Sequence, residues 1–185
     1  MENSQQQDLL TDEVLYVRYG TFWPRFWAIF LDGLILAILA PITIYNRTEW
    51  KSFTLLFIVS FIQIVYKPFF EYKYGATPGK MALGLTVVNY EFGQASLEQI
   101  IIRNIFQILS GVIVLGLSIY TFNQPDFYFA STSIEYSRIG YTAIATFIWQ
   151  ILMFAIVLTD FIFLVSSDDS RCLHDRMGKT FVIKD

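Results

Sequence analysis

The first long apolar segment of the sequence contains a single acidic residue, Asp32. A carboxylate inside a membrane helix costs on the order of 2.5 to 3.5 kcal/mol on insertion scales unless it faces protein, water or a partner. Such acids bind cations or protons, or they form buried ion pairs. Arg25 lies two helical turns earlier on the same face, roughly 10 Å along the axis. We expect Arg25 to reach the membrane interface, and Arg103 is the nearest candidate partner of Asp32 by its depth.

A dense group of charged and nucleophilic residues follows the last apolar segment, over residues 168–176. Cys172 and His174 lie two positions apart and would point to different faces of a helix, which disfavours a catalytic pair. Asp168 and Asp175 would complete a metal site with them, but the spacing supports no ligand geometry. We therefore predict neither a metal site nor a cofactor, and we interpret the segment as a solvated, ion-paired helix end.

Each of the later apolar segments carries polar side chains along one edge. The three stripes are Ser60, Gln63, Lys67 and Glu71; Gln99, Arg103, Gln107 and Gly111; and Thr142, Thr146, Gln150 and Asp160. Hydroxyls and amides at such edges let membrane helices pack closely and form hydrogen bonds. The alternative interpretation is a hydrated path in which Asp32 or Asp160 binds a cation or a proton beside a basic neighbour.

The amino-acid composition indicates the environment of these residues. The chain has 185 residues, of which 55% are hydrophobic and 16% are charged, and its mean hydropathy is +0.48. A soluble domain of this size could not bury so much apolar surface, so a lipid-facing exterior is expected. The net charge of −3 excludes a nucleic-acid binder that relies on a basic surface. One cysteine and one histidine exclude a disulfide framework and a structural zinc site of the usual kind.

Four segments have the length and polarity of membrane helices. About 20 mainly apolar residues are needed to cross roughly 30 Å of hydrocarbon. We predict an all-α membrane protein with a polar N-terminal tail at residues 1–21 and a transmembrane domain at residues 22–185. The predicted spans are residues 26–45, 52–70, 104–122 and 139–165.

The basic residues indicate how these spans are oriented. Alternating the spans across the membrane places ten basic residues on one side and three on the other, Arg47, Lys51 and Arg138. Because basic residues in short loops stay in the cytoplasm, both termini are predicted to be cytoplasmic.

The stretch between the second and third spans, residues 72–99, is mixed in character and should lie at the cytoplasmic interface. Thr77 and Pro78 are a suitable cap and first residue for a short helix that runs through Leu83. Two short β-branched runs, residues 85–88 and 180–183, are predicted to pair as a small β-ribbon.

Several short motifs in this order resemble the RDD family of small bacterial membrane proteins. They are Tyr19-Gly20-Thr21-Phe22-Trp23-Pro24-Arg25-Phe26, Leu31-Asp32-Gly33-Leu34, Thr77-Pro78-Gly79-Lys80, Gly84-Leu85, Val87-Val88, Arg171, Leu173-His174-Asp175 and Gly178-Lys179-Thr180. The family is named after one arginine and two aspartates, and the resemblance assigns these to Arg25, Asp32 and Asp175. It implies a bacterial cytoplasmic (inner) membrane protein. Most members have no assigned activity, and sodium/proton antiport has been attributed to some.

Two functions follow as hypotheses. In the first, the protein is a Na+/H+ antiporter in which Asp32 titrates beside Arg25 or Arg103; an antiporter of four helices is expected to form a homo-oligomer. In the second, it is a membrane scaffold that assembles with partner proteins through a structural network of charges. An enzyme is not expected, because the sequence lacks a nucleophile elbow, a phosphate loop and a metalloprotease helix. The candidate site residues are Arg25, Asp32, Arg103, Asp160, Arg171 and Asp175.

Overall fold

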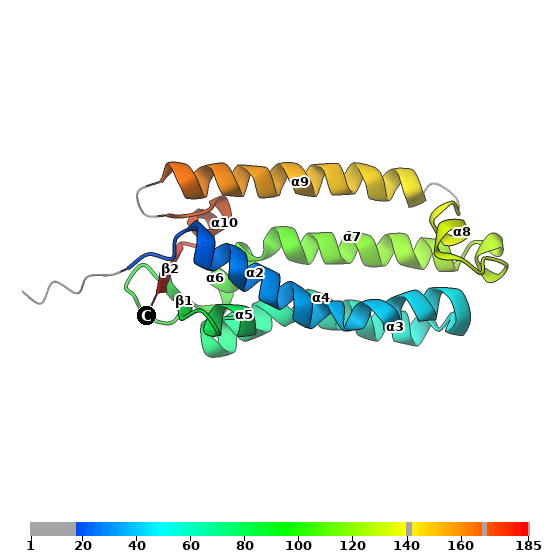
Figure 1. The fold of residues 1–185 in the computed structure, drawn as a ribbon, viewed down its shortest axis with the longest axis horizontal. Helices are drawn as coiled ribbons and strands as arrows, with labels where there is room; N and C mark the ends of the chain where they lie inside the picture. The colour runs from blue at the N-terminus through cyan, green and yellow to red at the C-terminus, as the bar shows by residue number, and fades with distance from the viewer. Residues whose placement is uncertain (1–17, 140–141, 168–169, 185) are drawn as a thin grey trace, which may run out of the picture.

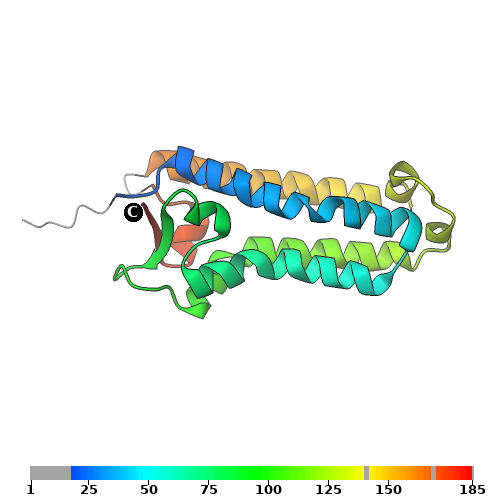
Figure 2. The same ribbon diagram turned by 60° about the horizontal axis from the view of Figure 1, so that its bottom comes forward.

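Long helices lying side by side form most of the molecule, as the computed structural model describes it for residues 18–139, 142–167 and 170–184 (Figures 1 and 2). In chain order the elements are α2 (Phe22–Ala37), α3 (Leu39–Tyr45), the π-helix η1 (Asn46–Trp50), α4 (Phe53–Tyr74), α5 (Pro78–Met81), β1 (Leu85–Asn89), α6 (Leu97–Arg103), α7 (Ile105–Phe122), the 3-10 helix η2 (Pro125–Tyr128), α8 (Ser133–Ser137), α9 (Thr142–Ser166), α10 (Leu173–Met177) and β2 (Thr180–Lys184). Most of the predicted N-terminal tail, residues 1–17, lies outside the described residues.

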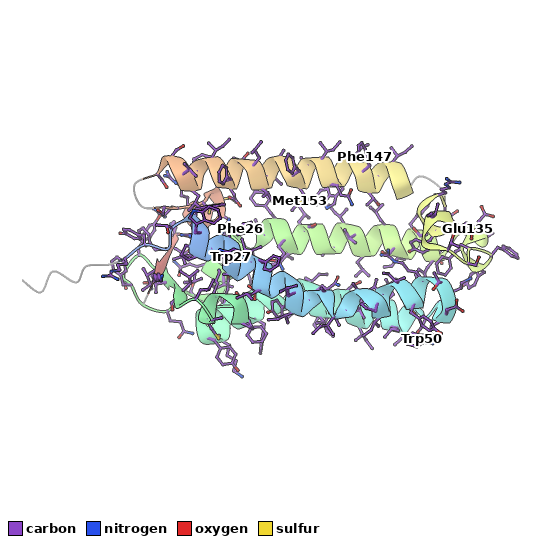
Figure 3. All side chains as sticks on the ribbon, in the orientation of Figure 1. Phe26, Trp27, Trp50, Glu135, Phe147 and Met153 are labelled. Carbon is purple, nitrogen blue, oxygen red and sulfur yellow. The ribbon has the colours of Figure 1, made fainter. Side chains whose placement is uncertain are left out.

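Within the described residues, three helices, α4, α7 and α9, are long and apolar enough to cross a membrane. A fourth crossing results if α2 and the α3–η1 segment, which are bent by 42° relative to each other, count as one span. Large apolar side chains point outward along these helices, as Trp50 and Phe147 do in Figure 3. A mostly helical protein with a multi-pass membrane architecture is therefore confirmed.

The bend in the first span has a local cause in the sequence. Pro41 has no backbone N–H to donate to the carbonyl of Ala37, four residues earlier, and its ring crowds that carbonyl. Helix α2 ends at Ala37. The expectation of one continuous helix over residues 26–45 was therefore wrong, because Pro41 interrupts the hydrogen-bond ladder.

The two ends of the bundle differ in structure. One end carries α5, α6, α10 and the two strands, and we call it the capped end; the other carries η1, η2 and α8, and we call it the far end (Figure 1). The amide of Lys184 donates to the carbonyl of Arg18 at 2.8 Å, so both ends of the described chain lie at the capped end. Arg47, Lys51 and Arg138 all belong to the far end. That the capped end faces the cytoplasm stays a prediction.

The predicted β-ribbon is confirmed. Strands β1 and β2 pair antiparallel, with Val87 opposite Val182. Leu85, Val87 and Val182 are each 1% exposed and pack in one apolar cluster with Ala28 of α2. The ribbon thus fastens both the middle and the end of the chain to the start of the first span.

The predicted short helix is also present, but Thr77 does not act as predicted. Thr77 occupies the N-cap position of α5 and Pro78 its first position, yet the Thr77 side chain makes no cap hydrogen bond. The helix ends at Met81, before Leu83. Its close approach to α2 requires glycine at position 79, because a Cβ there would lie 2.2 Å from the carbonyl oxygen of Ala28.

Substituting this glycine tests the contact between α5 and α2. Gly79→Ala is expected to lower the free energy of unfolding by about 1 to 3 kcal/mol, since the backbone of Ala28 cannot yield without moving a helix. Gly33→Ala in α2 is the matched control, because a Cβ at position 33 would meet nothing within 4 Å. Denaturant titration in detergent micelles measures both, and equal stability of the two variants would contradict the packing described.

Candidate functional site

Asp32 is held by three hydrogen-bond donors, and all three are neutral. The hydroxyl of Tyr66 donates to Oδ1 at 2.9 Å, the hydroxyl of Thr77 to Oδ2 at 2.5 Å, and the amide of Gly79 to Oδ1 at 2.8 Å. The carboxylate is half-buried. Arg103, the partner expected from its depth, instead binds other acids, because it lies at the end of α6, which packs on α10 and α4.

The local sequence explains why Asp32 faces these donors. Ala28 and Asp32 are four residues apart and therefore share a face of α2. Ala28 is completely buried and lies against Gly79. The absence of a side chain at Gly79 lets its backbone amide reach the Asp32 carboxylate. The hydroxyl of Thr77 makes no helix-capping hydrogen bond and instead donates to the second oxygen of the Asp32 carboxylate.

The oxygen atoms around Asp32 are of the kinds that bind hard cations. An ionised carboxylate offers about four lone-pair positions, of which the three donors occupy three. The hydroxyl oxygens of Tyr66 and Thr77 also keep lone pairs. Each of the two hydroxyls can therefore act as a donor to the carboxylate or as an oxygen ligand.

Arg25 is buried within the protein, whereas its depth relative to the membrane interface stays a prediction. It is only 7% exposed and turns inward to Asp175, with 2.5 Å between NH1 and Oδ2. Its Nε donates to the carbonyl of Gly20 at 2.6 Å and its NH2 to the carbonyl of Ser170 at 2.8 Å. Arg25 therefore joins the start of α2 to the end of the chain.

Asp175 is the centre of a buried row of alternating charges. Its other oxygen pairs with Arg103, whose Nε lies 3.3 Å from Glu71 Oε2. Glu71 pairs in turn with Lys80. Arg103 also donates to the hydroxyl of Thr180 at 2.8 Å. We call Arg25, Asp175, Arg103, Glu71 and Lys80 the charge row.

The interpretation of the C-terminal segment as a solvated helix end was wrong for Asp175, which is completely buried. The row joins α2, α4, α5, α6 and α10, five elements distant in sequence. Burial of one ion without its partner costs several kcal/mol, so each member depends on its neighbours.

The pKa values of residues in the charge row reflect two opposing effects, burial and the charges of neighbouring residues. Burial would raise the pKa of Asp175, but the charges of Arg103 and Arg25 outweigh burial and hold this pKa well below its usual range. Burial lowers the pKa of Lys80 to about 8 against the opposing effect of Glu71. Burial would likewise lower the pKa of Arg103, yet the carboxylates of Asp175 and Glu71 raise it. Asp175 and Arg103 are therefore both charged at neutral pH.

Asp160 and Arg171 lie outside the charge row. Asp160 of α9 contacts His174, with 2.8 Å between Oδ2 and Nδ1, and His174 Nε2 lies 3.4 Å from Asp175 Oδ1. His174 thus bridges α9 to the row. Arg171 donates to the hydroxyl of Tyr90 at 2.6 Å and lies over the ring of Phe181, so it covers the ribbon and is not part of an ion pair among the described residues.

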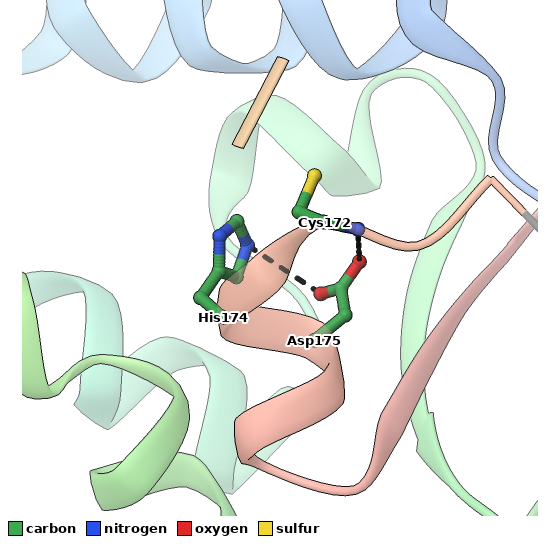
Figure 4. A group of neighbouring side chains, drawn as sticks. All are labelled: Cys172, His174 and Asp175. Atoms are coloured by element: carbon green, nitrogen blue, oxygen red, sulfur yellow. Dashed lines mark hydrogen bonds and ion pairs between the residues drawn. The ribbon is translucent and has the colours of Figure 1, made fainter. Parts of the chain in front are cut away.

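Cys172, His174 and Asp175 place their ligand atoms within 4.8 Å of one another (Figure 4). The set does not fit a metal ion. Both oxygens of Asp175 already bind arginines, and Arg25 NH1 lies 3.6 Å from the Cys172 sulfur. Burial raises the pKa of the Cys172 thiol to about 11, so it is protonated at neutral pH. Asp168, the fourth ligand considered from the sequence, lies outside the described residues.

Several residues of these sites had no role assigned from the sequence. Glu71 was recognised only as part of a polar stripe, and Lys80 only as part of a motif. Their pairing depends on the chain reversal at Gly75, which ends α4 in the left-handed conformation with φ of 72°. The position of Gly79 beside Asp32 depends on the same reversal, whereas Tyr66 reaches Asp32 from α4 itself.

Removing the central carboxylate tests the charge row. Asp175→Asn leaves Arg25 and Arg103 buried without a shared counter-ion, and we expect a loss of about 3 to 5 kcal/mol in the free energy of unfolding. Asp126→Asn removes an exposed carboxylate at the far end and should change stability by less than about 0.5 kcal/mol. Unfolding in micelles compares the two, and a loss for Asp175→Asn no larger than that of the control would contradict a structural role.

The acid stability of the protein gives a second test. The pKa of Asp175 is lower in the folded than in the unfolded state, so the unfolded state binds the proton more readily. The stabilisation is thus complete above the ordinary carboxyl pKa of about 3.9 and is lost as the pH falls below it. Stability measured from pH 7 to pH 3 should decline in the wild type and less steeply in Asp175→Asn; parallel profiles would argue against this assignment.

A comparison with known protein families agrees with these features. No curated protein and no solved structure matches the chain. A family model described as the RDD family matches residues 19–179, a range that includes Arg25, Asp32, the charge row and strand β1. The chain therefore belongs to the RDD family.

Proposed function

We propose that this RDD family protein exchanges sodium for protons across a bacterial cytoplasmic membrane, with Asp32 binding each ion in turn. One observation carries the proposal: no basic side chain in the described part of the chain pairs with Asp32, although it lies in a span. Its charge remains available for a mobile cation. Antiport follows when one carboxylate can hold a proton or a metal cation, but not both together.

The donors around Asp32 support this exchange. The backbone N–H of Gly79 can act only as a hydrogen-bond donor. The hydroxyls of Tyr66 and Thr77 can rotate and act as donor or acceptor. They donate to the carboxylate in the empty state. A bound cation would receive their oxygen lone pairs, and a protonated Asp32 would donate to one of them.

The charge row has a different task in this proposal. Each of its two carboxylates is already held by two cations, so neither is free to bind a transported ion. The row instead holds α5 in position, and α5 provides two of the three donors to Asp32. Orientation of the capped end toward the cytoplasm is supported by the ten basic residues assigned to that side.

A non-transporting scaffold is the second candidate. The observation that favours it is the charge row itself, because a buried set of five charges that joins five elements suits a rigid assembly module. In that case the partners are other membrane proteins or further copies of this chain, and Asp32 serves only to hold α5 against α2.

Flux in proteoliposomes distinguishes the two candidates. Purified wild type is expected to move protons when a sodium gradient is imposed, and Asp32→Asn to lose at least about 90% of that flux, which is one factor of ten or about 1.4 kcal/mol. Asn should fold, since its carbonyl can accept from Tyr66 and Gly79 while its NH2 donates to the Thr77 oxygen. Asp126→Asn is the matched control and should retain flux.

The contrary outcomes are equally clear. Normal flux through a folded Asp32→Asn variant would remove Asp32 from the mechanism. Wild type that is silent under sodium, lithium and potassium gradients, while a specific membrane protein co-purifies, would support the scaffold instead.

A further inference from the structure

A small cavity lies in the far half of the bundle, apart from both sites described above. Its volume is about 40 Å³, and residues of α3, η1, α4 and α7 line it. The residues that line it are Thr43, Asn46, Arg47, Leu55, Leu56, Val59, Ser60, Gln63, Val114 and Ser118. No carboxylate is among them.

Arg47 contributes the only formal charge to this lining. Its Nε is shielded from solvent and has no hydrogen-bond partner in the described chain. No acidic side chain of the described residues lies within ion-pair distance of it, although its guanidinium lies 4.9 Å from the centre of the Tyr136 ring. The side chain as a whole is half-buried, and its shielded Nε is a donor that lacks an acceptor in the described chain.

The other polar groups in the cavity add donors. The hydroxyls of Thr43 and Ser118 donate to carbonyls of their own helices at 2.9 and 2.8 Å. The hydroxyl of Ser60 makes no hydrogen bond within the described chain, so it can donate into the cavity. One guanidinium and one free hydroxyl, without a carboxylate, are the chemistry of an anion site.

The volume limits the size of the anion. A cavity needs about 10 to 15 Å³ to hold one water molecule. This cavity can therefore hold a few water molecules or one small ion. A lipid phosphate with its attached glycerol would not fit. We propose that the cavity is a binding site for a small monovalent anion of the halide type, held by Arg47 and Ser60.

The site is independent of the proposed antiport, but it lies close to its path. Gln63, at one edge of the cavity, precedes Tyr66 by one helical turn, and Tyr66 binds Asp32. A bound halide would offset the positive charge of Arg47, which otherwise opposes cations that approach Asp32 from the far end.

The experiment measures halide binding to the purified full-length chain in detergent. Chloride replaces gluconate at constant sodium concentration and ionic strength, and the unfolding temperature is followed together with the line width of the chloride NMR signal. Wild type should gain unfolding temperature in a saturable way, because a ligand of the folded state stabilises it. Bromide should displace chloride and narrow the NMR signal.

Two variants decide the assignment. Arg47→Gln should lose the saturable response, while Arg138→Gln, which removes an exposed arginine at the same end, should keep it. Ser60→Ala retains the charge and should weaken chloride binding about fivefold, the equivalent of one hydrogen bond. If Arg47→Gln does not fold, the Ser60→Ala result alone is decisive, and unchanged affinity overturns the proposal.

Two further outcomes would also overturn it. One is a chloride response of equal size in wild type and Arg47→Gln, which would indicate a general salt effect. The other is a wild type without any saturable response. Sodium flux in proteoliposomes is measured separately, so failure of the halide site and failure of antiport are distinguishable.

Discussion

The pairing of Asp175 with Arg25 and Arg103 is the interaction on which the capped end depends. Three cations and two carboxylates are buried there, and none of them can lose its partner without leaving an uncompensated charge. These residues belong to α2, α4, α5, α6 and α10. Their pairing therefore brings distant parts of the sequence together. Apolar packing of Leu85, Val87 and Val182 against Ala28 reinforces the same arrangement.

Once the capped end is assembled, the surroundings of Asp32 follow. The pair formed by Glu71 and Lys80 holds α5 beside the second span, and Gly79 lets it touch the backbone of α2. Asp32 then receives neutral donors where a cation would have cancelled its charge. The protein thus has two kinds of buried or half-buried acid: Asp175 and Glu71, which pair with arginine and lysine, and Asp32, whose hydrogen-bond donors are neutral. At the far end, the Nε of Arg47 is a shielded donor that has no hydrogen-bond partner in the described part of the chain.

Much of the fold could be predicted from short-range patterns. The apolar segments indicated the long helices, and the β-branched runs at residues 85–88 and 180–183 indicated the ribbon. Pro41 carried the signal for the bend in the first span, and it was not used. The helix start at Thr77 and Pro78 was correct, whereas the role of the Thr77 hydroxyl was not, because a nearby carboxylate competes with the backbone as its acceptor.

By itself, the sequence determined that the chain enters a membrane, which segments can cross it, and that Asp32 needs compensation, because length, hydropathy and the cost of a charge in lipid act locally. It could not determine which groups provide that compensation. Arg103 was the partner expected for Asp32 from its depth, and Arg25 was expected at the interface, yet both bind Asp175. Only the tertiary structure decided this, since pairing depends on the chain reversal at Gly75 and on the return of the chain end to the first span, and neither is encoded in a local pattern.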